Sequence, residues 1–559
     1  MTLTALAVRR IPTSLKRLRS LWVAGLVLVL AVAGVAMLGA ARRTSATFDE
    51  VFMIASGARG WEIGRFDMTL DHPPVTQFLY GLPVYLTAPA YPDERAQNWV
   101  LNRFGYGREL LWNAGNDPER LTLLARGMGI LLALGLVVAV ATYTWRRYGP
   151  AAGFLAGTLI AFTPDVLAHG AIAYNDVPMA LAYFLGVWSV DHAARGPTLR
   201  RMIAAAAVCT IAIGVKFSAV ALVPVALILF GIELALHRGS HLRYVRRVAL
   251  LTVPAVAAAY LILVAIYLGD FTLQHFRYGL EFNVRHASLG HGGVAAWLLG
   301  RGDPEGFWYF FPVAFLFKTP AAFHLLLIIA LLGLSRGEGH ADDAAPSSFR
   351  GPRVREALVS PLRAPVVGML VFLAFLLRAN LNIGFRHALP ALPFVCVIVA
   401  VGAMRFWRTR AGPLRWTVPG LVALAAASSL SFYPHFIGYT SEYAPSRDRG
   451  YNIFVDSSLD WGQGLIELRD YMREQGIERV YLAYFGSALP EGYGIDYEPL
   501  PSFFRLPERE PTRPPPQHVV ISATHLRGGY LPTDLYAEFR QREPDAVLAH
   551  SLFVFRVRD

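Results

Sequence analysis

The residues from Leu21 to Ala40 read LWVAGLVLVLAVAGVAMLGA, a run of twenty residues that carries no charge. Twenty residues of α-helix rise about 30 Å, which matches the hydrocarbon core of a bilayer. Basic residues precede the run, namely Arg9, Arg10, Lys16, Arg17 and Arg19. No clear cleavage site follows, and many more apolar runs do. We therefore expect a retained first membrane span with its N-terminus in the cytoplasm.

The composition of the whole chain is typical of a multi-span membrane protein. Hydrophobic residues make up 54% of the 559 residues, and the mean hydropathy is +0.40. The net charge of +12 does not indicate nucleic-acid binding, because the basic residues fall in short loops on the side of the N-terminus. Further spans are predicted at about 123–144, 151–169, 177–194, 201–215, 218–236, 248–268, 320–334, 364–380, 388–404 and 416–433. One tight turn, at Gly214-Val-Lys216-Phe, is needed for this pattern of eleven spans.

The segments without spans define the predicted domains. Residues 41–122 and 269–319 form long loops on the periplasmic face. Residues 434–559 contain alternating apolar runs at 480–485, 518–522 and 551–557, which predict strands, together with helices at 465–475 and 535–542 and a Pro-rich segment at 507–516. The predicted fold is an α-helical polytopic membrane protein of about eleven transmembrane helices. Its membrane domain covers 1–433, and a small periplasmic α/β domain covers 434–559.

Two acidic motifs follow the first span: Phe48-Asp49-Glu50 and Asp71-His72-Pro73-Pro74. Carboxylates close to hydrocarbon mark candidate functional sites. A helix cap is the alternative, since Asp and Glu favour helix N-termini, and this stretch alone supports both interpretations about equally. Adjacent helical residues point about 100° apart. One member of the Asp49–Glu50 pair should therefore face the site, while the other caps a helix or pairs with a base such as Arg126.

Polar residues gather in the later loops of the same membrane face. Acidic and polar side chains come first, and basic ones follow: Asp165, His169, Asn175 and Asp176, then His275, Arg277, His286, His291, Lys318, Arg386 and His387. Each basic residue alone is better explained as an anchor to lipid headgroups. Together the set suits transfer from a lipid-phosphate sugar. In such a reaction a carboxylate deprotonates the acceptor or holds a divalent metal, and cations bind the departing phosphate.

At this point the sequence resembles the glycosyltransferase C superfamily, specifically the branch of protein O-mannosyltransferases and aminoarabinose transferases. The two acidic motifs carry this resemblance, together with Ala125-Arg126, Tyr174-Asn175-Asp176, Lys216-Phe217 and Phe385-Arg386-His387-Ala388-Leu389-Pro390. Two further stretches look like bacterial lipid-carrier-dependent glycosyltransferases: Gly306 to Pro320, which includes Phe317-Lys318-Thr-Pro320, and Asp456-Ser-Ser-Leu-Asp460-Trp-Gly-Gln463.

The resemblance implies a polyprenyl-phosphate sugar donor and inverting transfer, at the outer face of the inner membrane, to a hydroxyl of a protein, lipid or glycan. It implies Asp49 as the catalytic carboxylate, with Glu50 and Asp176 as its acidic companions. Substrate or lipid-phosphate contacts are expected from His72, Arg126, Lys216, Lys318, Arg386, His387, Asp460 and Trp461. A divalent metal on Asp49, Asp71 and His72 is one option, and no nucleotide or organic cofactor is expected.

Some features depart from this pattern or leave alternatives open. His72 stands where family members often have another basic residue before Pro-Pro, and the α/β tail replaces the sugar-binding repeats of eukaryotic mannosyltransferases. The acceptor therefore stays open. Asp460 and Trp461 have an alternative explanation, a strand-loop-helix turn in which Asp460 caps the helix. A polytopic transporter or flippase is the alternative function, although it would place charges inside spans and show matched halves. A non-catalytic receptor or scaffold would not need an acidic and basic set on one face.

Overall fold

The computed structural model of the protein describes residues 13–237, 239–289, 296–335, 360–410, 412–504 and 516–557. Most of these residues are α-helical, and a small β-sheet lies near the C-terminus. Arg9, Arg10, His291 and all but the last residue of the predicted Pro-rich segment 507–516 lie outside the described residues.

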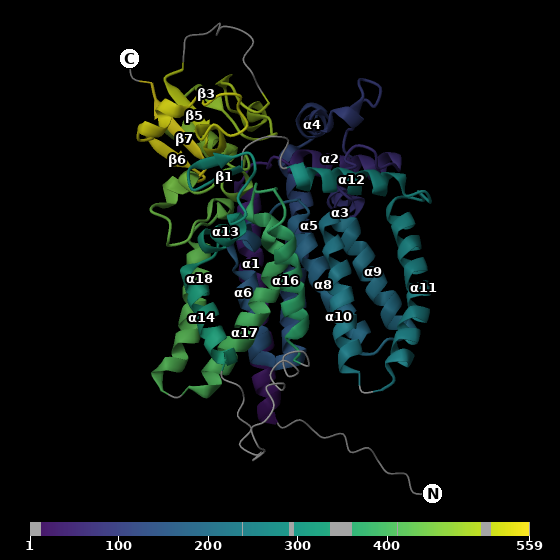
Figure 1. Ribbon diagram of the computed structural model, residues 1–559. Helices are drawn as coiled ribbons and strands as arrows, with labels where there is room; N and C mark the ends of the chain where they lie inside the picture. The colour runs from purple at the N-terminus through teal and green to yellow at the C-terminus, as the bar shows by residue number, and fades with distance from the viewer. Residues whose placement is uncertain are drawn as a thin grey trace, which may run out of the picture.

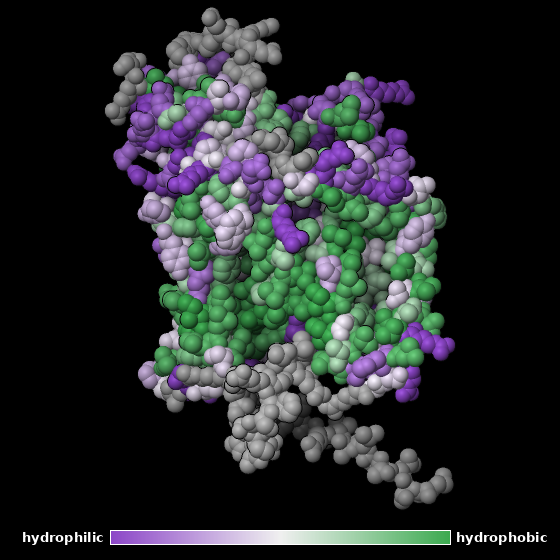
Figure 2. Space-filling model, in the orientation of Figure 1, coloured by the Kyte–Doolittle hydropathy of each residue, from purple (hydrophilic) through white to green (hydrophobic). Residues whose placement is uncertain are grey.

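Long apolar helices run side by side through the middle of the molecule (Figure 1). Within the described ranges, five helices are long and apolar enough to cross a membrane. They are α1 (Thr13–Arg43, apolar from Arg19), α5 (Pro118–Tyr148), η3 with α10 (Phe217–Leu236), α11 (His241–Ile266) and η4 with α17 (Phe385–Thr409). On the face shown in Figure 2, hydrophobic residues cover the middle of the helices, and hydrophilic residues gather mainly above them and at parts of the lower edge. An apolar band of this kind fits a bilayer, and the chain is a membrane protein.

The prediction of eleven spans is not confirmed, because several predicted spans are short or bent helices. The pair α6 (Pro150–Ala161) and α7 (Pro164–Gly170) bends by 64°, and the pair α13 (Phe310–Lys318) and α14 (Ala321–Ser335) bends by 108°. Counting each bent pair as one span gives up to seven in the described part of the chain. Pro164 and Pro320 stand at these breaks, where a proline cannot continue the preceding helix. The remaining bundle helices are α8 (Asp176–Arg195), α9 (Leu199–Val215), α16 (Arg363–Leu376) and α18 (Thr417–Leu430).

The long loop after α1 forms short helices across one end of the bundle. These are α2 (Glu50–Ile63), α3 (Pro74–Tyr85) and α4 (Arg103–Arg108). Figure 1 shows α2 and α12 (Gln274–Leu289) lying across the bundle rather than along it. Helices α2 and α3 touch through two glycines, since a Cβ on Gly57 would lie 2.0 Å from the carbonyl oxygen of Gln77 and one on Gly81 would lie 2.0 Å from Gly57. This close approach fixes the loop that carries Asp71 and His72.

The C-terminal region, residues 434 to 557 where described, contains a mixed five-stranded sheet in the order β4-β3-β5-β7-β6. Strand β3 (Val480–Ala483) runs parallel to β4 (Tyr497–Pro499) and β5 (His518–Ser522), and β7 (Leu552–Arg556) is antiparallel to β5 and β6 (Ala546–Leu548). All three predicted strands are present, and the helix predicted at 465–475 is α19 (Leu465–Gln475). The helix predicted at 535–542 is instead a short 3-10 helix, η10 (Ala537–Gln541).

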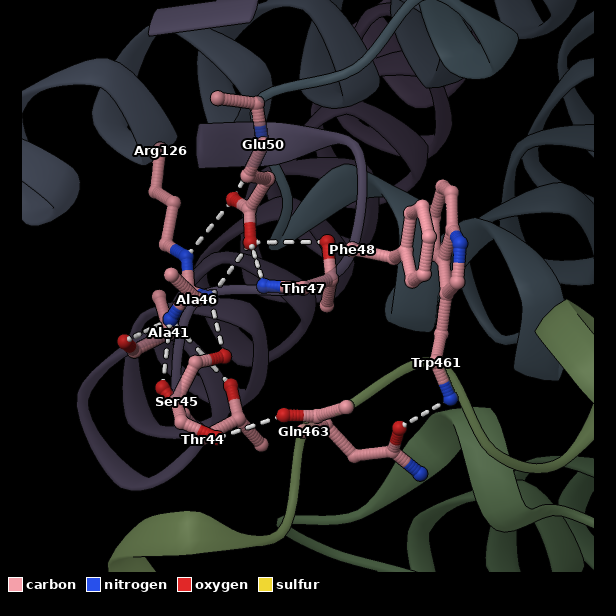
Figure 3. Close-up of polar contacts among 12 residues, drawn as sticks. Ala41, Thr44, Ser45, Ala46, Thr47, Phe48, Glu50, Arg126, Trp461 and Gln463 are labelled. Atoms are coloured by element: carbon pink, nitrogen blue, oxygen red, sulfur yellow. Dashed lines mark hydrogen bonds and ion pairs between the residues drawn. The ribbon is translucent and has the colours of Figure 1, made fainter. Parts of the chain in front are cut away.

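Backbone hydrogen bonds join the C-terminal region to the segment between α1 and α2 (Figure 3). The amide of Ser45 donates to the carbonyl of Gln463 over 3.1 Å, and that of Phe48 donates to the carbonyl of Trp461 over 2.9 Å. The Ser45 hydroxyl donates to the carbonyl of Gly462 over 2.8 Å. The C-terminal region is therefore attached to the bundle directly beside Asp49.

Candidate functional site

Asp49 stands at the N-cap position of α2, yet its side chain makes no capping hydrogen bond. A capping Asp would accept a bond from the amide two or three residues later. The carboxylate is directed instead towards Arg386, whose Nη2 lies 3.7 Å from Asp49 Oδ2. That separation is an ion pair rather than a tight hydrogen bond. The side chain of Asp49 is 17% exposed, so solvent or a substrate can reach it. The geometry therefore favours a functional role over the capping interpretation.

Arg386, in η4 (Phe385–Ala391), lies at the centre of the site and is contacted from three other parts of the chain. Its Nη1 lies 3.3 Å from Asp176 Oδ2, and its Nε donates to the hydroxyl of Ser457 over 2.9 Å. The guanidinium also packs over two aromatic rings, 4.1 Å from the centroid of Trp461 and 5.0 Å from that of Tyr174. Stacking of this kind holds the plane of a guanidinium in one orientation. Arg386 thus bridges Asp49 and Asp176 in a fixed geometry.

Asp176 is the first residue of α8, and its carboxylate forms an ion pair with a second cation, Lys216. The Nζ of Lys216 lies 2.5 Å from Asp176 Oδ1. Helix α9 ends at Val215, Lys216 itself is extended, and η3 begins at Phe217, which confirms the predicted break at this point. The lysine side chain keeps 18% of its surface exposed. The carboxylates of Asp49 and Asp176 therefore alternate with the cations of Arg386 and Lys216, and the four charges balance.

His72 and Asp71 approach the site from the loop between α2 and α3. The Nε2 of His72 lies 3.6 Å from Asp71 Oδ2, and the imidazole stacks on the ring of Phe52 at 5.7 Å. Burial lowers the pKa of His72 below its ordinary value despite the attraction of Asp71. Burial therefore favours the neutral imidazole, which can donate or accept hydrogen bonds.

Arg103 supplies a positive charge that sequence reasoning missed. Its Nη1 lies 2.6 Å and 2.7 Å from the two oxygens of Asp71, and its guanidinium packs 4.4 Å above the ring of Phe52. The side chain is 30% exposed and interacts electrostatically with Asp49. Because Arg103 lies far from any recognised motif, only the folded loop brings it to the site.

His387 lies behind Asp176 and Lys216, with which it interacts electrostatically. Its Nε2 is buried without a hydrogen-bond partner among the described residues. Asp49, His72, Asp176, Lys216, Arg386 and His387 are thus the predicted site residues that the fold brings together. Ser457, which binds Arg386 from the C-terminal region, lies within the stretch Asp456–Gln463 that the sequence singled out, but it was not itself predicted as a site residue.

Glu50 and Arg126 form a separate, fully buried ion pair (Figure 3). Arg126 donates from Nε and Nη2 to the two carboxylate oxygens of Glu50, over 2.9 Å and 2.7 Å. The remaining guanidinium bonds go to the backbone carbonyls of Ala41, Thr44 and Ser45 and to the hydroxyl of Thr44. Glu50 also accepts hydrogen bonds from the amide and hydroxyl of Thr47 and from the amide of Ala173. This arrangement corrects the catalytic role expected of Glu50 and the phosphate contact expected of Arg126, since both are sealed inside the fold.

Lys318, at the end of α13, is also not placed for the phosphate contact that the sequence predicted. The side chain is only 1% exposed. Its ammonium donates to three backbone carbonyls, those of Ile437, Tyr439 and Ser458, over 2.8 to 2.9 Å. An ammonium has three donors, so none is left for a lipid phosphate. Lys318 instead ties the segment after the last bundle helix to α13.

Asp460 and Trp461 are also buried, with 0% and 2% of their surface exposed. This burial argues against the direct sugar contact predicted for them. Trp461 packs on Arg386 and acts on the site through that residue. Asp460 Oδ2 accepts a hydrogen bond from the amide of Thr524 over 2.9 Å, at the start of α20 (Ala523–Leu526). Asp460 therefore accepts a hydrogen bond from a helix N-terminus, as the capping interpretation expected. The helix is α20, however, and not α19, which follows Asp460 in the chain.

We expect Asp460→Asn to stabilise the protein at alkaline pH. Burial raises the pKa of Asp460 from its ordinary value of 3.8 to about 7, although the bond from Thr524 opposes this. The contribution of protonated Asp460 to stability is therefore complete below the pKa of Asp460 in the unfolded chain. It is lost as the pH rises through the higher pKa of Asp460 in the folded protein. Asparagine still accepts the bond from Thr524 and has no charge to bury. The apparent melting temperature of purified Asp460→Asn should exceed that of the wild type at about pH 8, with a gap that narrows towards pH 5. A gap independent of pH would contradict this assignment.

The proposed metal ligands do not assemble into a metal centre. Asp71 is engaged by Arg103, and Asp49 is directed towards Arg386. Within the residues that the structure describes, no group of three or more His, Cys, Asp or Glu side chains is arranged to hold a metal ion. The set of Asp49, Asp71 and His72 therefore does not fit a metal, and no step is assigned to one.

Comparisons with known proteins were made on both sequence and structure. No family model and no curated protein sequence matches the chain. ArnT from Cupriavidus metallidurans bound to undecaprenyl phosphate is similar at 15% identity and a TM-score of 0.46, over 80% of this chain and 70% of that chain. The apo state of the same protein is similar at 14% identity and a TM-score of 0.47, over 76% of this chain and 67% of that chain. A third similar structure is the archaeal oligosaccharyltransferase AglB from Archaeoglobus fulgidus, in complex with an inhibitory peptide and a dolichol-phosphate. Its sequence identity is 10% and its TM-score 0.45, over 76% of this chain and 59% of that chain.

Two carboxylates and several cations lie at one end of an apolar helical bundle, next to the C-terminal region.

Proposed function

We propose that this protein is an integral membrane glycosyltransferase that moves a sugar from a polyprenyl-phosphate donor to a hydroxyl-bearing acceptor. The observation that carries the proposal is the ion-paired group of Asp49, Arg386, Asp176 and Lys216. It combines an accessible carboxylate with cations that a phosphate can approach. The sequence resemblance to the glycosyltransferase C superfamily supports the same function.

In the proposed step, Asp49 accepts the proton of the acceptor hydroxyl. The acceptor oxygen forms a bond to the anomeric carbon while the bond from that carbon to the phosphate oxygen breaks. The electron pair of the broken bond stays with the phosphate, which leaves as polyprenyl phosphate. A hydroxyl is a poor nucleophile at neutral pH, so a positioned base contributes directly to the rate. Attack opposite the leaving group inverts the anomeric configuration.

Negative charge grows on the phosphate as it leaves, and nearby cations stabilise it. Arg386, Lys216 and Arg103 are the candidates for this role. Lys216 and Arg103 are partly exposed, and each currently neutralises an Asp. Arg386 is more buried but directs Nη2 towards Asp49 across 3.7 Å, a contact loose enough to be exchanged for a phosphate oxygen.

We expect Arg386→Ala to weaken binding of undecaprenyl phosphate by about tenfold or more, the effect of losing a charge-assisted hydrogen bond. Arg386→Lys should restore only part of this affinity, since one ammonium cannot reach both Ser457 and Asp176 as the guanidinium does. Lipid titrations on the purified variants measure both effects. Arg378→Ala removes an exposed arginine beyond α16 and provides the matched control. Full rescue by lysine would indicate a plain positive anchor instead.

A transporter or flippase for a lipid-linked substrate is the second candidate, because it would also need to bind a lipid phosphate. The two functions differ in whether a covalent bond is broken. Purified protein incubated with polyprenyl-phosphate donors carrying radiolabelled sugars, in the presence of a cell-envelope extract as acceptor, should release lipid phosphate and label the acceptor. Movement of intact donor across vesicles without such release would favour the transporter.

The proposed topology places the N-terminus in the cytoplasm and the site, with the C-terminal domain 434–559, on the periplasmic side of the inner membrane. Basic loops on the side of the N-terminus support this orientation. A C-terminal fusion to alkaline phosphatase should therefore be active, and a C-terminal fusion to green fluorescent protein should be dark. The reverse pattern would place the site on the cytoplasmic side and exclude a periplasmic transfer.

A further inference from the structure

Four phenylalanine rings meet around Phe48, the residue that precedes Asp49. The ring centroids of Phe104, Phe485, Phe503 and Phe504 lie 5.1 to 5.5 Å from that of Phe48. Phe485 is buried, but Phe48, Phe104 and Phe504 are half-buried and Phe503 is 43% exposed. We call these four partly exposed rings the aromatic surface. Contiguous exposed apolar side chains, unlike scattered ones, mark surfaces that bind another molecule.

The aromatic surface continues to the candidate site through Phe104. The ring of Phe104 lies 5.5 Å from that of Phe48 and 5.2 Å from that of Phe52. Asp49 stands between these two phenylalanines in the chain. The carbonyl of Phe48 accepts a hydrogen bond from the hydroxyl of Ser487 over 2.5 Å, which fixes this end of the surface. A molecule that rests on the aromatic surface can therefore reach the carboxylate of the proposed base.

A recess borders the aromatic surface on the side of the C-terminal region. It lies at the carboxyl ends of the parallel strands β3 and β4, the edge at which open sheets of parallel strands bind ligands. Arg108 of α4, Tyr484 after β3, and Ser502 and Phe504 after β4 are among the residues that line it. The guanidinium of Arg108 lies 4.5 Å from the centroid of Phe504, whose ring stacks in turn on Phe48. The recess and the aromatic surface thus share one wall.

The chemistry of this wall favours one class of molecule. The face of an aromatic ring is electron-rich, so it does not attract a phosphate. It packs by dispersion on the C–H face of a sugar ring, and the hydroxyls at the edge of that sugar stay free to meet a base. A peptide is recognised instead by main-chain hydrogen bonds along a strand, which aromatic rings do not supply. Figure 1 shows α4 and β3 beyond the ends of the long helices, outside the part of the molecule that suits an acyl chain.

We propose that the acceptor is a carbohydrate, and that its sugar ring stacks on the aromatic surface while one of its hydroxyls reaches Asp49. The inference rests on the proposed function, because it takes Asp49 as the base. Polysaccharides and the headgroups of glycolipids share this chemistry. The inference narrows the proposed function, since it excludes the hydroxyls of serine and threonine side chains as acceptors.

The first test identifies the chemistry of the product. Full-length protein is incubated with polyprenyl-phosphate donors that carry radiolabelled sugars, together with separate protein, polysaccharide and lipid fractions of a cell envelope. The label should pass to the polysaccharides or to sugar-bearing lipids, and extraction with organic solvent distinguishes these two sources. Mild alkali, which releases sugars from serine and threonine by β-elimination, should release no labelled monosaccharide.

The outcomes of this test separate the two proposals. If no fraction is labelled, the proposed function fails and this inference fails with it. If the label enters protein and alkali releases it as a monosaccharide, the proposed function stands and the inference alone is overturned. Label on a lipid that carries no other sugar would overturn the inference in the same way.

The second test removes single rings from the aromatic surface. Phe503→Leu and Phe504→Leu keep an apolar side chain, and each should raise the KM for the labelled acceptor by about threefold to tenfold, the effect of losing one aromatic contact. The kcat and the affinity for undecaprenyl phosphate should stay unchanged, because the lost contact serves acceptor binding alone. Phe271→Leu, at a 68% exposed phenylalanine that follows α11, is the control and should alter none of these values. An unchanged KM would show that the rings only pack, and a lowered kcat would show that they position Asp49. Either result overturns the inference.

Discussion

Asp49→Asn is expected to reduce sugar transfer by at least about a hundredfold, the lower end of what a general base contributes. Asparagine has nearly the same shape as aspartate but cannot take a proton from the acceptor. The fold should tolerate the change, because the Asp49 side chain makes no capping hydrogen bond and asparagine favours the same N-cap position. Binding of undecaprenyl phosphate should stay near normal. Turnover of radiolabelled donor by the purified variant measures the first effect, and lipid titration measures the second.

Asp93→Asn is the matched control for this experiment. Asp93 lies in the same long loop and is exposed, and its carboxylate accepts a hydrogen bond from the amide of Arg95 within that loop. The same change of chemistry at this position should leave transfer and lipid binding intact. Near-normal turnover by Asp49→Asn, beside an unaffected Asp93→Asn, would remove Asp49 from the catalytic role. A loss of lipid binding by Asp49→Asn would instead indicate that it holds Arg386 in place.

The sequence predicted the helices well where an apolar run alone determines the structure. The span predicted at 248–268 is α11 (His241–Ile266), and the one at 123–144 lies within α5 (Pro118–Tyr148). Apolar periodicity is a property of one segment of the sequence, so the helix it predicts does not depend on distant parts of the chain. Bends are different, because the angle between α13 and α14 depends on what packs around Pro320 rather than on hydropathy. For this reason the number of spans was the weakest part of the prediction.

The candidate site shows the same division between local and distant information. Asp49, Asp176, Lys216 and Arg386 were found because each stands where an apolar helix begins or ends and matches a family motif. Arg103 and Ser457 belong to the site only through contacts that span 32 and 71 positions of the chain. The phosphate contact predicted for Lys318 differs from the contacts it makes, for a related reason. Its partners are backbone carbonyls, and carbonyls have no signature in a sequence.

The largest effect on stability is expected at the buried pair of Glu50 and Arg126. Glu50→Gln leaves the guanidinium of Arg126 without a counter-charge at 1% exposure. Removing one member of a buried ion pair typically lowers the free energy of unfolding by about 3–5 kcal/mol. Burial alone would raise the pKa of Glu50, but the charge and hydrogen bonds of Arg126 lower it below its ordinary value. The contribution of the pair is therefore present above the unfolded pKa of Glu50 and is lost as the pH falls through the folded one.

A double-mutant cycle separates this pair from the catalytic residue beside it. Glu50→Gln and Arg126→Met should each lower the apparent melting temperature strongly, and the double variant should lose less than the sum, because it leaves no unpaired charge. Glu281→Gln is the control, since it breaks an exposed pair with Arg285 that is worth about 0–1 kcal/mol. Additive losses would show that the two residues act independently, despite their two hydrogen bonds. Because Glu50 lies next to Asp49 in the chain, this pair also sets the start of α2, and with it the direction in which the Asp49 carboxylate points.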